Sequence, residues 1–200
     1  MSQNKDKVIA VFDFDGTITT KDTLFDFIKF YYGSASLIMG IFSILPILIA
    51  FKLRILPNEI AKQEFLYHFF AQKKYDEFKE KCNAYKERIN NILRPKTMEK
   101  IKYHQNEEHK VIIISASIED WILPWAKSMN IHEVYGTKLE IIDNTITGKL
   151  ASKNCRGEEK VKRLLEIYPD RANYTLYMYG DSSGDKDILA IADHPFYRNF

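Results

Sequence analysis

Cysteine is scarce in this chain of 200 residues, which contains only Cys82 and Cys155. The two are far apart in the sequence and lack the spacing of metal ligands, as do the five histidines. This excludes a disulfide framework and a cysteine-type zinc site, and it fits a reducing compartment. The first residues, MSQNKDK, form no apolar signal segment. We therefore expect a cytoplasmic protein.

An excess of either charge is also missing, since 29 basic residues stand against 27 acidic ones, for a net charge of +2. The basic residues are scattered, which excludes a broad surface for nucleic acid. No internal repeat or low-complexity segment is evident. With 46% hydrophobic and 14% aromatic residues, the chain can bury a substantial core, and its length suits one domain with a large insertion or two small domains.

Charge is completely absent from the 22 residues between Phe30 and Phe51. That length reaches the range in which a membrane span must be considered. Glycines, three serines and Pro46 interrupt the run, however, and Lys52 and Arg54 add only a weak cationic flank. We therefore expect two short apolar helices packed on each other and on a catalytic domain. Peripheral membrane association of residues 30–51 is the alternative that we do not favour.

Three apolar runs predict strands that are covered on both faces, as in a parallel sheet flanked by helices. Val8 to Phe12 precedes Asp13, Val111 to Ile114 precedes Ser115, and YTLYMYG precedes Asp181. Between the first two runs the pattern is helical throughout. The sequence therefore predicts an α/β fold with a Rossmann-like parallel sheet and an inserted helical cap. Residues 1–20 and 95–200 would form the core, and residues 21–94 the cap.

Two further segments carry local signals. SIEDWILPWAKSM predicts a helix capped by Ser117 and distorted by Pro124. TKLEIIDNTITGKL predicts a hairpin that turns at Asp143 and Asn144.

The carboxyl ends of the three strands would meet at one edge of the sheet, which is where open α/β sheets bind ligands. Asp13, Asp15, Asp181 and Asp185 would gather there. Carboxylates around one point repel each other unless a cation neutralises them, and their hard oxygen atoms suit Mg²⁺. We expect Asp13 and Asp181 to supply side-chain ligands to Mg²⁺.

An anion site is predicted beside these carboxylates. Ser115 and the backbone N–H groups that follow it, starting at Ala116, would bind a phosphoryl group. Lys160, at the start of a predicted helix, would hold Asp13 and the phosphate together and offset negative charge in the transition state.

In order and spacing, DFDGT, IIISAS, Lys160 and YGDSSGD resemble the four motifs of the haloacid dehalogenase-like hydrolase superfamily. The helical insertion resembles the C1 cap of its phosphoserine phosphatase-like subfamily, IB. This resemblance implies that Asp13 is a nucleophile that forms an aspartyl-phosphate. It also implies that Asp15 is the general acid and base, with its backbone carbonyl on the metal.

The neighbouring residues of these motifs would have supporting roles. Gly16 allows a tight turn, and Thr17 would hydrogen-bond phosphate or cap that turn. Asp185 would orient Lys160 or reach the metal through water rather than ligate it directly.

The predicted function is Mg²⁺-dependent hydrolysis of a small phosphomonoester, with a phosphomutase as a related alternative. The uncharged segment, the following KLRIL and the later NCRGEEK are similar to bacterial phosphatidylglycerophosphatase C, so a lipid phosphatase is a second alternative. A non-catalytic phosphate-binding protein on this fold is the third, and the intact Asp13, Asp15, Lys160 and Asp181 speak against it.

Overall fold

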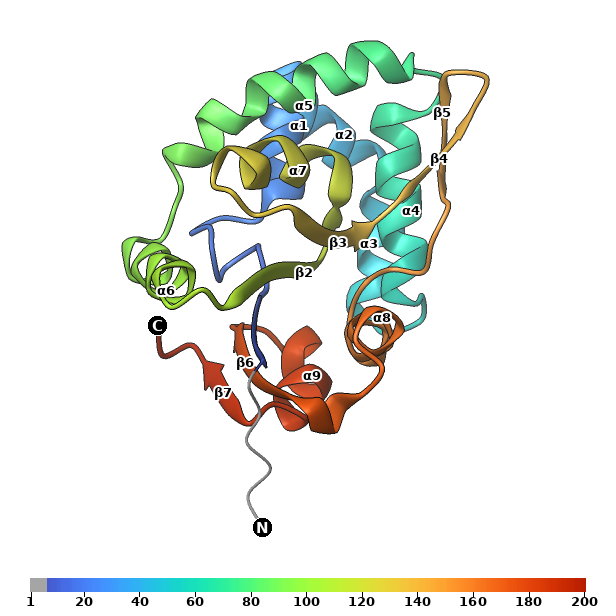
Figure 1. The fold of residues 1–200 in the computed structure, drawn as a ribbon. Helices are drawn as coiled ribbons and strands as arrows, with labels where there is room; N and C mark the ends of the chain where they lie inside the picture. The colour runs from blue at the N-terminus through green and yellow to red at the C-terminus, as the bar shows by residue number, and fades with distance from the viewer. Residues whose placement is uncertain (1–6) are drawn as a thin grey trace.

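A five-stranded sheet forms the centre of the computed structural model, which describes residues 7–200 (Figure 1). The strand order is β3-β2-β1-β6-β7, and every neighbouring pair is parallel. The strands are β1 (Lys7–Phe12), β2 (Lys110–Ile118), β3 (Glu133–Thr137), β6 (Tyr174–Gly180) and β7 (His194–Tyr197). The α/β fold with a parallel sheet, predicted from the apolar runs, is confirmed.

Alternate side chains of β1 enter two different cores because successive residues of a strand point to opposite faces. Ala10 and Phe12 face one core, and Ile9 and Val11 face the other. The first core is covered by α6 and α7, and the second by α8 and α9. These helices are α6 (Pro95–Asn106), α7 (Glu119–Ser128), α8 (Glu158–Ile167) and α9 (Lys186–Ala190).

Six helices separate β1 from β2 in the sequence, and the first five, here called the helical insertion, occupy the upper and right-hand parts of the molecule in Figure 1. They are α1 (Thr23–Tyr32), α2 (Ser34–Ser43), α3 (Leu45–Lys52), α4 (Asn58–Phe70) and α5 (Tyr75–Asn90). The chain leaves and re-enters the sheet region at adjacent points, since Thr20 N donates to Ile92 O at 2.7 Å.

The predicted hairpin is confirmed as β4 (Leu139–Ile142) and β5 (Thr145–Leu150). Asp143 and Asn144 have φ angles of 47° and 57°, as a two-residue hairpin turn requires. Although it lies between the core elements β3 and α8 in the sequence, the hairpin packs on α4 of the helical insertion.

Two details differ from the sequence-based expectation. Strand β2 continues to Ile118, so α7 begins at Glu119 without a side-chain cap, and the predicted Ser117 cap is wrong. Ser117 instead donates its hydroxyl to Asp15. Strands β3 and β7 were not predicted, because short strands at the edges of a sheet lack long apolar runs.

Pro124 lies inside α7, and the helix continues past it to Ser128.

An aromatic cluster joins the helical insertion to the helices on the sheet. The ring of Phe27 in α1 is fully buried and stacks on Trp121 of α7 at a centroid distance of 4.8 Å. Its other ring neighbours lie at 5.0 to 6.4 Å and are Phe30, Tyr31, Phe70, Phe78 and Tyr85. Burial and ring contacts at this position therefore stabilise both parts at once.

Phe27→Ala should lower the free energy of unfolding by about 3–5 kcal/mol, because it removes a fully buried ring and leaves a cavity. Phe25→Ala is the matched control on the same helix, since Phe25 is 40% exposed and should cost about 1 kcal/mol or less. Urea unfolding followed by circular dichroism measures both values. Equal losses for the two variants would contradict a joining role for the Phe27 cluster.

Candidate active site

The ends of β1, β2 and β6 border one polar cavity of about 310 Å³. It lies where the strand order reverses, the position at which α/β sheets of this type bind ligands. The residues predicted from sequence that line it are Asp13, Asp15, Gly16, Ser115, Ala116, Lys160 and Asp181. Thr17 and Asp185 do not line this cavity but are fully buried beside it.

Lys160 lies between two carboxylates at the base of this cavity. Its Nζ is 2.7 Å from Asp13 Oδ1 and 2.6 Å from Asp185 Oδ1, and all three side chains are buried. Burial raises the pKa of Asp13 to about 6, even though the Lys160 charge lowers it. Burial lowers the pKa of Lys160, but the charges of Asp13 and Asp185 raise it well above its usual value. Lys160 therefore remains cationic and holds Asp13 in place.

Asp185 is anchored through both of its oxygen atoms. While Oδ1 accepts from Lys160, Oδ2 accepts from the backbone N–H groups of Asp181 and Ser182 at 3.2 and 2.9 Å, and from Ser182 Oγ at 2.9 Å. A carboxylate that already has four donors is a poor direct metal ligand, and this geometry favours a role in orienting Lys160.

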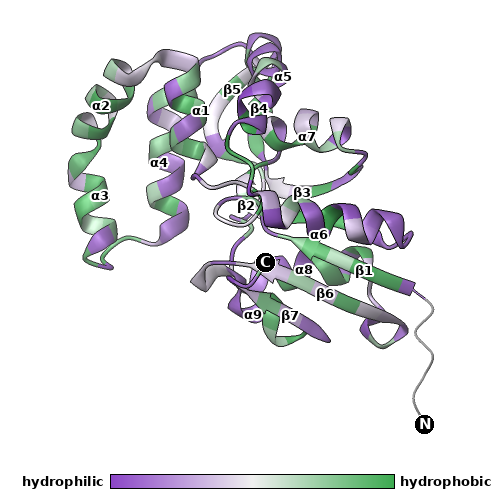
Figure 2. Cartoon of the chain, turned by 90° about the vertical axis from the view of Figure 1, so that its left-hand side faces the viewer, coloured by the Kyte–Doolittle hydropathy of each residue, from purple (hydrophilic) through white to green (hydrophobic). Residues whose placement is uncertain are grey.

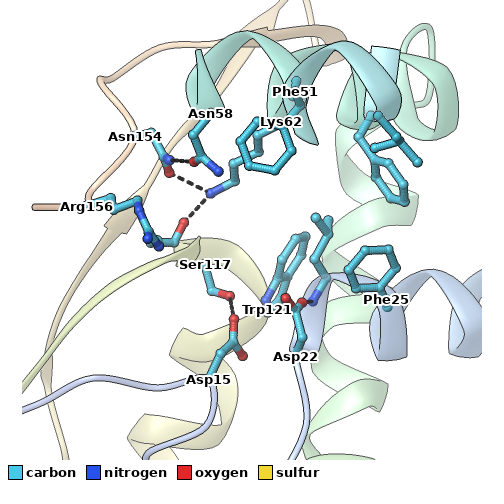
Figure 3. A pocket seen from close by; sticks show the side chains of 15 residues that line it. Asp15, Asp22, Phe25, Phe51, Asn58, Lys62, Ser117, Trp121, Asn154 and Arg156 are labelled. Atoms are coloured by element: carbon cyan, nitrogen blue, oxygen red, sulfur yellow. Dashed lines mark hydrogen bonds between the residues drawn. The ribbon is translucent and has the colours of Figure 1, made fainter. Parts of the chain in front are cut away.

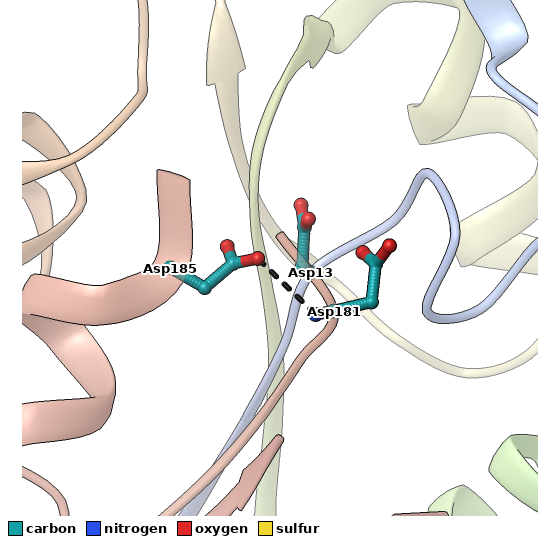
Figure 4. Close-up of side chains that lie close together, drawn as sticks. All are labelled: Asp13, Asp181 and Asp185. Carbon is teal, nitrogen blue, oxygen red and sulfur yellow. Dashed lines mark hydrogen bonds between the residues drawn. The ribbon is translucent and has the colours of Figure 1, made fainter. Parts of the chain in front are cut away.

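The donor set fits a small divalent cation. Oxygen atoms of Asp13, Asp181 and Asp185 lie within 4.8 Å of one another, and Figure 4 shows their carboxylates around one space. Burial, and then the charge of Asp185, raises the pKa of Asp181. Oxygen ligands with surplus negative charge suit Mg²⁺. Asp13 and Asp181 could therefore hold Mg²⁺ through their side chains.

The turn after Asp15 brings the chain against Asp181. Gly16 has a φ of 77°, and a Cβ at this position would lie 2.4 Å from Asp181 Oδ2. No other residue type therefore fits here without displacing the Asp181 carboxylate. Thr17 donates its hydroxyl to Asp181 Oδ1 at 3.2 Å, so it supports Asp181 and does not line the polar cavity.

Asp15 has a different environment from Asp13, although only two residues separate them. Its Oδ1 accepts from Thr23 N at 2.9 Å and from Thr23 Oγ1 at 2.6 Å, and its Oδ2 accepts from Ser117 Oγ (Figure 3). Burial, and then the charge of Asp22, raises the pKa of Asp15 to about 7. A carboxyl group with this pKa can both donate and accept a proton near neutral pH.

A second cavity of about 260 Å³ adjoins the first and shares Asp15, Asp22, Ala116 and Arg156 with it. Figure 3 shows its residues converging from the helical insertion and from the loop before α8. Its polar side includes Asn58, Lys62, Asn154 and Arg156. Its apolar side includes Leu24, Phe25, Leu48, Phe51 and Phe65. The remainder of a substrate held at Asp13 would lie here.

Lys62 is a site residue that the sequence did not reveal. It donates to Ala116 O, to Asn154 Oδ1 at 2.9 Å and to Thr137 Oγ1 at 3.2 Å. Within residues 7–200 no carboxylate oxygen lies within 4.0 Å of its ammonium group. Burial lowers the pKa of Lys62 to about 8. The charges of Asp15 and Asp22 favour its ammonium form, and its position in the second cavity suits an anionic group of a ligand.

Comparison with known proteins identifies the family of this chain. A family model described as haloacid dehalogenase-like hydrolase matches residues 10–190, and the chain belongs to that family. The Caulobacter vibrioides protein CicA is similar at 31% identity over 195 residues, which cover 96% of this chain and 86% of CicA.

Two solved structures share the fold. A protein of unknown function from Bordetella pertussis Tohama I superposes with a TM-score of 0.80 at 18% identity, over 92% of this chain and 86% of that one. A phospho-aspartyl intermediate analogue of phosphoserine phosphatase superposes with a TM-score of 0.61 at 14% identity, over 93% of this chain and 83% of that one.

Lys62→Met should change the pH dependence of stability. Because burial lowers the folded-state pKa of Lys62 to about 8 from 10.5, the unfolded chain binds more protons at Lys62 between these values, and the contribution of Lys62 to stability rises with pH there. The free energy of unfolding of wild type minus that of Lys62→Met should be larger at pH 10.5 than at pH 7, by on the order of 2 kcal/mol. Urea unfolding at both pH values measures this difference. A constant difference would contradict the lowering of the Lys62 pKa by burial.

Proposed function

We propose that this protein is a Mg²⁺-dependent phosphomonoesterase that works through an aspartyl-phosphate on Asp13. The observation that carries the proposal is the position of Asp13. Its buried carboxylate is held by Lys160, lies beside Asp181 and borders the same cavity as Ser115. Membership of a hydrolase family supports it as well.

In the first step, Asp13 attacks phosphorus and the bond from phosphorus to the leaving oxygen breaks. Asp15 gives its proton to that oxygen, and its pKa of about 7 leaves much of it protonated near neutral pH. Ser115 and Lys160 bind the phosphoryl oxygens, where charge accumulates. Bound Mg²⁺ would neutralise phosphoryl charge.

In the second step, Asp15 takes a proton from water, which attacks phosphorus and breaks the bond to Asp13. Inorganic phosphate leaves and both carboxyl groups return to their starting states. Thr23 and Ser117 hold Asp15 through hydrogen bonds, so it keeps one orientation through both steps. The fold shared with the phospho-aspartyl analogue of phosphoserine phosphatase is consistent with this sequence of steps.

The substrate class that we propose is a small phosphorylated metabolite whose second polar group reaches Lys62 or Arg156. A phosphorylated lipid is a second candidate, because Leu48 and Phe51 make part of the second cavity apolar. A screen of phosphoamino acids, sugar phosphates, nucleotides and phospholipids would distinguish the two classes.

Asp13→Asn should lower the hydrolysis of p-nitrophenyl phosphate by three orders of magnitude or more, about the loss expected when a nucleophile is removed. EDTA should abolish wild-type activity, and added Mg²⁺ should restore it. Release of p-nitrophenol measures both effects. Asp187→Asn is the matched control, because Asp187 is exposed in α9, and it should retain activity.

Hydrolysis by Asp13→Asn at the wild-type rate would show that Asp13 is not the nucleophile. Full activity in EDTA would instead show that hydrolysis needs no metal, and it would not bear on the role of Asp13. The two arms therefore fail separately.

Asp15→Asn should still react with p-nitrophenyl phosphate at Asp13, since p-nitrophenolate leaves without a proton donor. Loss of the general base should slow hydrolysis of the phospho-enzyme by about 10²–10⁴-fold, so the adduct accumulates. Rapid-quench mass spectrometry detects it as added phosphate on the peptide that contains Asp13. The double variant Asp13→Asn/Asp15→Asn should form no adduct. Wild-type turnover by Asp15→Asn without an adduct would refute the assigned role.

A further inference from the structure

Helices α2 and α3 have one apolar face that packs on the protein and another that does not. On the inner face, Ile44 is buried, and Gly40 lies so close to Phe69 of α4 that a Cβ would come within 2.1 Å of its ring. Eight of the 14 exposed large hydrophobic residues among residues 7–200 lie between positions 38 and 55. Seven of them, here called the apolar outer face, are Ile38, Met39, Phe42, Leu45 and Ile49 on α2 and α3, and Leu53 and Ile55 in the turn after α3.

The apolar outer face lies along one edge of the molecule. In Figure 2, α2 and α3 form a largely hydrophobic column at the outer left, away from the sheet. The uncharged run was expected to form two short helices packed on each other and on a catalytic domain, but its inner face packs on α1 and α4 of the helical insertion. The outer face is exposed to solvent, whereas monomeric soluble proteins rarely expose large contiguous apolar patches.

The charges around this face match an anionic surface. No acidic residue occurs between Asp26 and Glu59, while Lys29, Lys52 and Arg54 are exposed at the two ends of the uncharged run. An amphipathic segment binds a lipid surface by burying apolar side chains below the headgroups and placing cations among anionic headgroups. A protein interface would instead be expected to have a polar rim with hydrogen-bonding groups.

The helix lengths favour shallow insertion. Among the described residues no single helix is long and apolar enough to cross a membrane. Residues Thr23–Ser43 and Leu45–Lys52 meet the length and composition criteria only as a pair bent by 64°. A bent pair with one face held against α4 can place its other face among headgroups and upper acyl chains.

We propose that the apolar outer face docks on an anionic lipid bilayer. The same helices reach the site, because Leu48 and Phe51 of α3 line the second cavity next to Asp15. Docking would therefore bring that cavity close to the membrane surface. The proposal concerns binding and does not depend on hydrolysis of a phosphate ester.

Co-sedimentation with vesicles of phosphatidylcholine, or of phosphatidylcholine with phosphatidylglycerol at about 7:3, tests the proposal. Wild type should bind the anionic vesicles more strongly. Ile38→Gln should weaken that binding about tenfold, because it removes one inserted aliphatic side chain. Ile142→Gln is the matched control, since Ile38 and Ile142 are both 55% exposed and Ile142 lies on the hairpin. It should bind as wild type does.

A second measurement is independent of sedimentation. Phe42→Trp places an indole on the apolar outer face, and its emission should shift to shorter wavelength with anionic vesicles, as expected when a ring leaves water. Trp121 and Trp125 are fully buried and provide the unchanged background.

Several outcomes would overturn the proposal. These are no binding to either vesicle, equal binding to both vesicles, and equal binding by wild type and Ile38→Gln. Sedimentation equilibrium tests whether a second copy of the chain binds the apolar outer face instead. A dimer that Ile38→Gln dissociates, without vesicle binding, would assign the face to a second copy of the chain.

Discussion

The buried contact of Lys160 with Asp13 and Asp185 is the interaction on which the candidate site depends. Two carboxylates cannot remain ionised and close together in a buried place unless a cation lies between them. Removal of Lys160 would leave two buried carboxylates without their cation, which costs far more than the net contribution of the intact group. Asp185 also binds the backbone at Asp181 and Ser182, so the same contact positions the loop after β6.

Environment separates the roles of two identical side chains. Asp13 faces the ammonium of Lys160 at the end of β1, whereas Asp15 accepts hydrogen bonds from the backbone N–H and hydroxyl of Thr23 and from the hydroxyl of Ser117. The pKa of Asp15 is raised to about 7 and that of Asp13 to about 6. Two neighbouring carboxyl groups with different partners can thus divide nucleophilic and proton-transfer roles within one short loop.

The sequence was informative where a local pattern determines structure. Apolar runs identified the three central strands, and polar residues directly after them identified most of the cavity. Ser117 was assigned to a helix cap, although it lies two residues after Ser115 on the same strand and period-two spacing could have placed both on one side. Lys62 gave no such signal, because its partners Ala116, Thr137 and Asn154 come from three distant parts of the chain.

The hairpin changes which parts of the molecule would move together. It leaves the sheet region at a narrow base, where Ala151 N donates to Lys138 O at 2.9 Å. Its far end exchanges backbone hydrogen bonds with the chain after α4, including Gln72 N to Ile146 O at 2.8 Å. A rotation of the helical insertion would therefore carry β4 and β5 as one rigid body. The hairpin base and the crossings at Thr20 and Ile92 connect this unit to the chain of the sheet region, and Thr23, the donor that holds Asp15, lies shortly after Thr20 in the same segment.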